Sequence, residues 1–204
     1  MLMSIAQRID VPRNELVYSK GEDAHFIYNI VEGVAKTYQL QAEGDKCVTA
    51  FLFSHDLMGL SHRGLYVSTA RALTSLSAFR IPVVRLKEIL EQDARLCAGL
   101  LHKLCDKLQC FQHHVIMLSK RSASARIASF LLQIEQADVD SVAGDGEIIL
   151  PMNRQDIASY AGLSVEAVSR SLHSLESEGA IMRRGPHRVC ILDREKLRRL
   201  AKVC

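Results

Sequence analysis

The sequence predicts an α+β protein made of an N-terminal antiparallel β-roll, a long dimerisation helix and a C-terminal winged helix-turn-helix. Three observations predict it. Short apolar runs alternate with turn signals in the first half, a heptad repeat follows, and two short amphipathic segments flank a glycine near the C-terminus. With 204 residues and 48% hydrophobic content, the chain can bury the cores of about two domains. We expect the parts to span residues 1–92, 93–119 and 120–204.

The roll is predicted from residues 14 to about 88. Apolar runs at 26–31, 34–38 and 48–53 are separated by Gly33 and by the turn around 43–45. Several short strands at such intervals are typical of an antiparallel barrel or roll.

The dimerisation helix is predicted from apolar residues spaced alternately four and three apart over residues 93–119. This spacing describes the seam of a parallel two-helix coil between identical subunits. An amphipathic helix packed on its own sheet is the alternative. The dimer is favoured because a small helix-turn-helix unit, which is predicted for the C-terminal part, normally acts in pairs. The repeat begins at Cys97, and the residues assigned to the dimer interface are Leu101, Leu104, Leu108, Phe111, Val115 and Leu118.

A polar hinge at 119–124, an apolar-rich helix at 125–134 and a polar loop at 138–147 lead into the two short helices. Asn153 is placed to cap the first helix, and Gly162 to end it. Ser164 is placed to cap the second, which buries Val168 and Leu172 with their neighbours at spacings of three and four.

A different face of the second helix carries Glu166, Ser169, Arg170 and His173, at i, i+3, i+4 and i+7. Arginine can donate two hydrogen bonds to guanine, glutamate can accept from the cytosine amine, and serine can do either. We therefore predict that Glu166, Ser169 and Arg170 read DNA bases.

The segment 180–192 consists of two short runs around Gly185-Pro186, which is typical of a β-hairpin wing. Residues 151–204 carry ten Lys/Arg against six Asp/Glu, a charge of +4, while residues 1–150 carry −1. Cations collected at one end of the chain are expected to contact phosphates. The residues assigned to the DNA backbone are Asn153, Arg154, His173, Arg183, Arg184, His187 and Arg188.

The stretch 150–181, LPMNRQDIASYAGLSVEAVSRSLHSLESEGAI, resembles the winged helix of the Crp/Fnr superfamily of bacterial transcription regulators. Glu166, Ser169 and Arg170 are similar to the Fnr-type pattern E-x-x-S-R, and Val165 stands where the Crp type has its first arginine. The resemblance implies an inverted repeat of TTGAT-type half-sites rather than TGTGA, with RNA polymerase as a partner. Lys20-Gly21-Glu22 and Val31-Glu32-Gly33 look like the opening of the family's cyclic-nucleotide-binding-like roll.

The effector of the roll is not identified by the sequence. Cyclic AMP is disfavoured because Gly59-Leu60 and the segment 66–69 lack the carboxylate and the arginine that such rolls use, and Arg71 lies several residues late. An Fnr-type iron–sulfur cluster is disfavoured because residues 1–46 contain no cysteine. Haem is left open as a cofactor of a nitric oxide or carbon monoxide sensor, and its candidate axial ligands are His25, His55, His62, His102, His113 and His114.

A thiol-redox regulator is the other alternative within the family, through Cys105 or Cys110. A metal- or thiol-dependent enzyme is a distant alternative, because the six cysteines and eight histidines form neither a ligand set nor a nucleophile–base pair. We therefore predict no catalytic residue and no metal site. No run of eighteen apolar residues and no secretory signal are present, so we expect a cytoplasmic protein with reduced thiols and no membrane partner.

Overall fold

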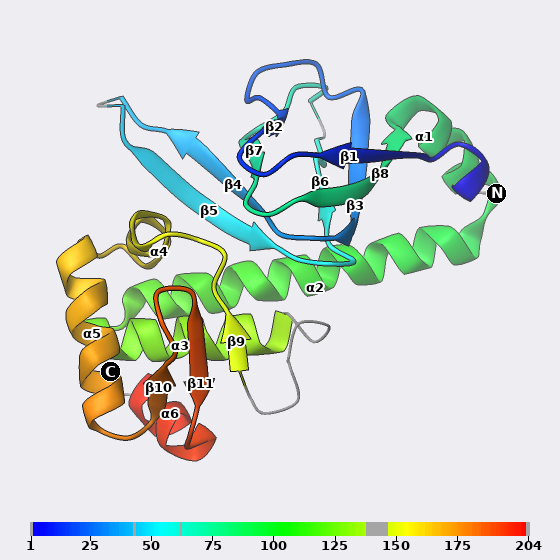
Figure 1. Ribbon diagram of the computed structural model, residues 1–204. Coiled ribbons are helices and arrows are strands. Elements are labelled where there is room, and N and C mark those ends of the chain that lie inside the picture. Colours follow the sequence, from blue (N-terminus) through cyan, green and yellow to red (C-terminus); the bar gives the residue numbers. More distant parts are fainter. Residues whose placement is uncertain (1, 43, 62, 138–146, 203–204) are drawn as a thin grey trace. The chain divides into compact units, whose positions relative to one another are not determined.

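The computed structural model describes residues 2–42, 44–61, 63–137 and 147–202. The chain divides into two compact units, Met1–Cys110 and Phe111–Cys204, and each is described by itself (Figure 1). Among the described residues, no helix is both long enough and apolar enough to cross a membrane.

The first unit contains two antiparallel four-stranded sheets, which confirms the predicted roll. One has the strand order β1-β8-β3-β6 and the other β2-β7-β4-β5. A short 3-10 helix, Leu2–Ser4, precedes them. The strands are β1 (Gln7–Val11), β2 (Leu16–Tyr18), β3 (Phe26–Glu32), β4 (Ala35–Leu40), β5 (Lys46–Leu52), β6 (Leu57–Met58), β7 (Thr69–Ala72) and β8 (Leu76–Pro82).

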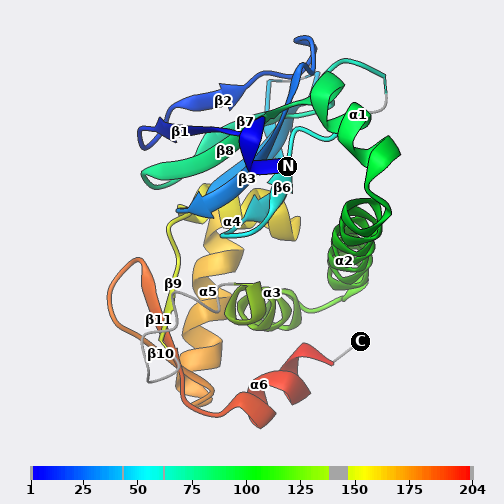
Figure 2. The same cartoon turned by 90° about the vertical axis from the view of Figure 1, so that its right-hand side faces the viewer.

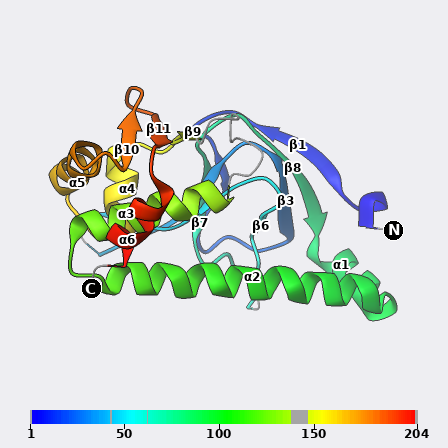
Figure 3. The same cartoon turned by 90° about the horizontal axis from the view of Figure 1, so that it is seen from below.

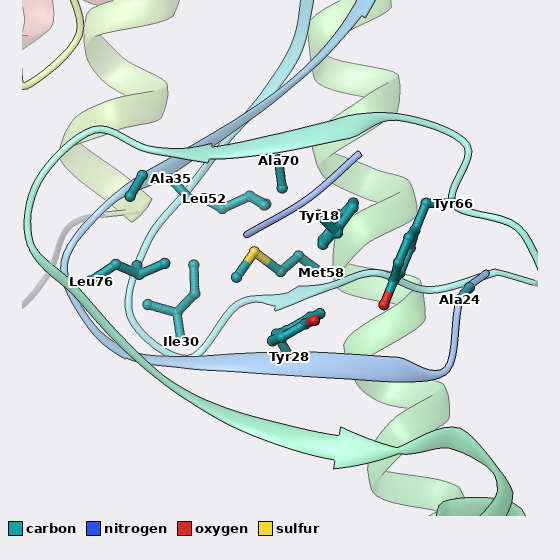
Figure 4. Close-up of a cluster of buried hydrophobic side chains, with 11 residues drawn as sticks. Tyr18, Ala24, Tyr28, Ile30, Ala35, Leu52, Met58, Tyr66, Ala70 and Leu76 are labelled. Atoms are coloured by element: carbon teal, nitrogen blue, oxygen red, sulfur yellow. The ribbon is translucent and has the colours of Figure 1, made fainter. Parts of the chain in front are cut away.

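The interior of the roll is filled by side chains from both sheets, and three tyrosines occupy one end of it (Figure 4). Tyr18 stacks on Tyr66 with ring centroids 4.0 Å apart, and on Tyr28 at 5.7 Å. Two of the three hydroxyls are bonded to the backbone, since Tyr18 accepts from the Gly59 amide at 3.0 Å and Tyr66 donates to the Phe26 carbonyl at 2.9 Å.

Two helices complete this unit. The first, α1 (Val83–Gln92), was not predicted, since the strand pattern was extended to about residue 88. The second is α2 (Ala94–Ser119), which begins in this unit and ends in the other. Figure 3 shows α1 above the beginning of α2. Asp93 separates them, and its carboxylate accepts from the amides of Arg95 and Leu96, which caps α2.

The second unit contains helices α3 to α6 and a three-stranded sheet of order β10-β11-β9, which lies at one side of these helices (Figure 2). Its core is centred on α3, where Ile127, Phe130 and Leu131 are almost completely buried. The elements are α3 (Ala123–Ala137), β9 (Glu147–Ile149), α4 (Arg154–Ala161), α5 (Val165–Ser177), β10 (Ile181–Arg183), β11 (Arg188–Ile191) and α6 (Arg194–Ala201).

The sheet of this unit corrects one sequence-based expectation. Residues 138–147 were expected to be a loop, but Glu147 is the first residue of strand β9 and pairs with Cys190. The rest of that expectation, residues 138–146, lies outside the described part of the chain. Strands β10 and β11 form the predicted hairpin, in which Arg183 pairs with Val189.

Candidate nucleic-acid interface

The two helices α4 and α5 are each started and ended by local contacts. The Asn153 side chain accepts from the Asp156 amide at 2.8 Å, and the Ser164 hydroxyl accepts from the Ala167 amide at 3.2 Å. Between them Gly162 adopts the left-handed conformation, with φ of 61°. An added Cβ there would lie 3.3 Å from both Arg126 and Leu118, so a side chain is disfavoured by conformation and by crowding.

The face of α5 that was assigned to base reading is exposed. Val168, Leu172 and Leu175 hold the opposite side of the helix in the core, whereas Glu166 and Arg170 lie in solvent. In the described part of the chain, no hydrogen bond or ion pair restrains the guanidinium of Arg170. Its charge contributes to lowering the pKa of the Glu166 carboxyl, one turn away.

The other two side chains of this face have defined states. Glu166 lies in the first turn of α5, where hydrogen bonds from its own amide and from Ser164 lower the pKa of its carboxyl, so that it is ionised and can only accept. The Ser169 hydroxyl donates to the Val165 carbonyl at 3.0 Å. With that proton engaged, Ser169 presents an acceptor to solvent.

The wing is attached to α5 by Arg183 and Glu176. Arg183 donates from Nε and Nη2 to Oε2 of Glu176, at 2.8 and 2.5 Å, and its amide donates to Oε1 at 2.9 Å. Arg183 was assigned to the DNA backbone, and that role stays a prediction. Its observed contacts position the wing, because its guanidinium is already engaged by a carboxylate.

Arg184 and Arg188 lie at the exposed end of the hairpin, on either side of Gly185-Pro186-His187. Each is only loosely paired, with nitrogen atoms 4.0 and 3.8 Å from the carboxylate of Glu147. Their side chains are 53% and 60% exposed, so both remain accessible to an anion. His187 is less free, because its Nδ1 lies 2.9 Å from the Leu150 carbonyl.

Arg154, at the start of α4, lies against the same hairpin and donates to the Pro186 carbonyl at 3.3 Å. Burial, and then the charge of Arg183, lower the pKa of Arg154. The positive charges of Arg154 and Arg183 repel each other. A phosphate bound beside them would reduce this repulsion.

We expect Arg188→Ala and Arg183→Ala to have separable effects. Arg188→Ala should weaken binding to all DNA sequences alike and reduce the salt slope by about one per subunit, with the urea midpoint unchanged. Arg183→Ala should also lower the urea midpoint at neutral pH. Arg183 lowers the pKa of Glu176, so the stability from this pair is present at neutral pH and is lost as the pH falls below the ordinary value of 4.5. An unchanged midpoint at pH 7 would contradict a positioning role for Arg183.

Arg126 is an important residue of this unit that the sequence analysis missed. From α3 it donates to the carbonyl of Lys120 at 2.8 Å, and to those of Ala161 and Gly162 at 3.2 and 3.0 Å. The last two carbonyls end α4, where a positive charge is favoured by the helix dipole. Arg126 therefore fixes the turn of the helix-turn-helix to the segment that follows α2. Its only signal in the sequence is a cation inside an apolar helical run.

His114 on α2 makes a parallel contact with α4. Its ring stacks on Tyr160 with centroids 3.9 Å apart, and its Nε2 lies 2.8 Å from the Tyr160 carbonyl. Burial lowers the pKa of His114, so the ring is neutral at pH 7. Three successive carbonyls at the end of α4 are thus contacted by side chains from α2 and α3.

We expect Arg126→Ala to lower the free energy of unfolding by about 2 kcal/mol, because it leaves three carbonyl groups without their donor. Arg126→Lys should recover little, because one ammonium group cannot reach all three. Urea denaturation followed by circular dichroism measures this effect. Arg121→Ala removes an exposed cation from the same connection and serves as the control. Equal midpoints for Arg126→Ala and Arg121→Ala would contradict the assignment.

The predicted seam is exposed along α2. The exposed fractions are 56% for Leu101, 40% for Leu104, 59% for Leu108, 46% for Phe111, 66% for Val115 and 36% for Leu118. Leu118 is the most covered of the six, and it approaches the turn at Gly162. A continuous apolar row of this kind is rarely left in water by a soluble protein.

The roll interior offers no phosphate-binding cation at the position of Arg71. On β7, Ala70 and Ala72 face the core, so Arg71 faces outward, and its guanidinium contacts the Asn14 carbonyl. Gly59 occupies the tight turn beside the tyrosines, where a Cβ would lie 3.0 Å from the Phe26 carbonyl.

The residues offered as haem or redox groups are scattered. Within the described ranges, no cluster of three or more His, Cys, Asp or Glu side chains could hold a metal ion. The His114 ring contacts the Tyr160 carbonyl, and Nε2 of His25 lies 3.7 Å from Oδ2 of Asp23. His62 lies outside the described residues. Burial raises the pKa of the Cys110 thiol, which disfavours the reactive thiolate.

A capped pair of helices with a free polar face, flanked by a basic hairpin, defines a winged helix-turn-helix. Residues 125–200 match the model of the Crp-like helix-turn-helix domain, and residues 8–93 match that of the cyclic nucleotide-binding domain. The protein is therefore a DNA-binding transcription regulator and not an enzyme. It belongs to the Crp/Fnr superfamily.

Two relatives and one solved structure illustrate the similarity. The chain is 31% identical to the nitrogen fixation regulation protein FixK of Azorhizobium caulinodans, over 92% of this chain and 76% of that one. It is 30% identical to the transcriptional activator protein Anr of Pseudomonas aeruginosa, over 93% and 78%. The structure of FixK2 from Bradyrhizobium japonicum superposes with a TM-score of 0.89 at 26% identity, covering 98% of this chain and 99% of that one.

Proposed function

We propose that this regulator binds, as a homodimer, an inverted repeat of TTGAT-type half-sites. The observation that carries the proposal is the exposed face of α5, with Arg170 unrestrained, Glu166 ionised and Ser169 presenting an acceptor. An arginine donor pair fits the guanine of TTGAT, and a carboxylate fits the cytosine opposite it.

The homodimer is supported by the exposed apolar row on α2. In a parallel pair, Leu101, Leu108 and Val115 would occupy one set of core positions, and Leu104, Phe111 and Leu118 the other. Two recognition helices related by a two-fold axis fit an inverted repeat. We propose residues 1–92 as the regulatory roll, 93–119 as the dimer helix and 120–204 as the DNA-binding part, with RNA polymerase as a further partner.

We further propose that cyclic AMP does not activate the protein and that the DNA-binding form needs no ligand inside the roll. Side chains from both sheets already fill that space, the Tyr18 and Tyr66 hydroxyls are bonded to backbone groups, and Arg71 faces away from the interior. No observation on the described residues favours control by haem or by a thiol switch. The described residues favour instead a roll whose interior is filled by its own side chains.

Fluorescence anisotropy with a TTGAT-N4-ATCAA duplex tests this function. The wild-type protein, with no ligand added, should bind this duplex at least about 1,000-fold more tightly than a scrambled duplex at the same salt concentration. A TGTGA-type duplex of equal length is the matched control and should rank with the scrambled one. Equal affinity for all three duplexes, with and without added cyclic AMP, would overturn the proposed site.

A further inference from the structure

A cavity of about 350 Å³ lies in the first unit, on the outer side of the roll. It is partly open to solvent, and it is lined mainly by β3, β8, α1 and the first half of α2, which lie beside one another in Figure 3. Successive residues of β3 point to opposite faces of its sheet, so Tyr28 and Ile30 fill the roll interior while Ile27 and Asn29 line this cavity. It is therefore separate from the space that the tyrosines occupy.

The walls of the cavity are almost entirely apolar. Ile27, Phe79 and Ile81 form the side contributed by the sheet, and Leu86, Leu96 and Leu100 form the side contributed by the helices. Its volume lies near the lower end of the range of about 300–1,000 Å³ that small-molecule sites usually have. Such a space fits a slender apolar chain better than a large planar cofactor.

One end of the cavity carries a positive charge. Lys103 on α2 lines it, and its Nζ donates to the His55 carbonyl at 3.2 Å. Among the described residues no carboxylate pairs with this ammonium. The nearby Asp56 is engaged elsewhere, since its carboxylate lies 3.5 Å from Nζ of Lys107 and accepts from the Phe53 amide at 2.9 Å. Asn29 also lines this end and donates to the His55 and Asp56 carbonyls.

Gly99 lines the same cavity from α2. Its backbone is helical, so its conformation does not require glycine, and a glycine inside a helix is destabilising relative to alanine. An added Cβ would meet no atom within 4 Å. A side chain would therefore fit at position 99. Because glycine has none, the space between α2 and the cavity stays open.

We propose that this cavity binds an unbranched carboxylate of about eight to ten carbon atoms, with its chain between the sheet and α2 and its carboxylate at Lys103. The volume, the apolar walls and the unneutralised ammonium at one end together define this ligand class. The proposal that the carboxylate binds is based only on the cavity and does not depend on the proposed function. Its effect on DNA binding rests on the proposed function, because the cavity face of α2 adjoins the seam at Leu101 and Leu104.

Isothermal titration calorimetry of the 204-residue protein without DNA tests the proposal, with octanoate, decanoate and decanol kept below the concentrations at which they aggregate. Decanoate should bind about 15-fold more tightly than octanoate, because each buried methylene contributes about fourfold. Decanol should bind more weakly than decanoate. No saturable binding of decanoate, or equal affinity for the two acids, would overturn the proposal.

Two variants locate the site. Lys103→Met should abolish the preference for decanoate over decanol, whereas Lys87→Met, which removes an exposed cation from α1, should preserve it. Gly99→Leu should weaken both ligands at least tenfold while the circular dichroism spectrum and urea midpoint show a folded protein. Unchanged decanoate binding in Gly99→Leu, or a preference that survives Lys103→Met, would place the ligand elsewhere and overturn the assignment.

The DNA titration separates this proposal from the proposed function. If the wild-type protein does not prefer the TTGAT duplex over the scrambled one, the proposed DNA site is wrong, but the calorimetric result is unaffected. A calorimetric failure removes the ligand and leaves the DNA result standing. If both proposals are correct, decanoate should change the affinity of the wild type for the TTGAT-N4-ATCAA duplex but not that of Gly99→Leu. An equal change in both proteins would show that decanoate does not act by binding in this cavity.

Discussion

Replacing Arg170 by alanine is expected to abolish specific DNA binding while leaving a weak, salt-sensitive component. Each bidentate arginine–guanine contact contributes about 1–3 kcal/mol of discrimination. Two half-sites bind one dimer, so at about 2 kcal/mol per contact the affinity for the TTGAT-N4-ATCAA duplex should fall roughly 1,000-fold, to that for the scrambled duplex. Binding to the scrambled duplex should change little, because phosphate contacts supply nearly all of it.

A mutant cycle between protein and DNA makes this prediction sharper. Replacing the guanine of each TTGAT half-site should weaken the wild-type protein strongly and the Arg170→Ala variant hardly at all, because the lost partner is then already absent. Arg199→Ala removes a comparable exposed cation from α6 and is the matched control. If the base change weakened both proteins equally, Arg170 would not be the residue that reads this guanine.

Replacing Leu108 by glutamate is expected to convert the dimer into monomers. Leu108 lies mid-seam and is 59% exposed in the single chain, so in a parallel pair two glutamates would face each other across an apolar interface. Burying two unpaired like charges is strongly unfavourable. Affinity for the TTGAT-N4-ATCAA duplex should then fall about 100-fold or more, because the second half-site no longer benefits from linkage to the first.

Sedimentation velocity and fluorescence anisotropy measure these two effects on the same sample. Gln109→Glu introduces the same charge at the next residue of α2, outside the heptad positions, and should remain dimeric. The secondary structure of Leu108→Glu should match that of the wild type, because no contact within the chain depends on an exposed leucine. A dimeric Leu108→Glu variant would show that the subunits associate through another surface.

The features that could be predicted from the sequence are those whose interacting residues lie close together in the chain. Asn153, Gly162 and Ser164 act within a few residues of themselves, so their sequence pattern already located both helices correctly. The alternation of strands and turns likewise identified the roll. The pattern missed β1, α1 and α6, and α1 was missed because the strand region was extended to about residue 88.

The residues whose role was incompletely predicted are those with distant partners. Arg183 has the same sequence signature as Arg188, yet Glu176 on a neighbouring helix engages only Arg183. Arg126 contacts carbonyls 35 and 36 residues away, which no local pattern reveals. The Lys103 cavity exists only where α1, α2 and the sheet meet.

The sequence by itself determined the class of this protein, because helix caps, heptad spacing and the face of a recognition helix are set by residues within one or two turns of each other. Only the tertiary structure decided which cations remain free and which are engaged, that three tyrosines occupy one end of the roll interior, and that an apolar cavity lies outside it. These features depend on side chains brought together from separate elements, and packing alone sets their distances.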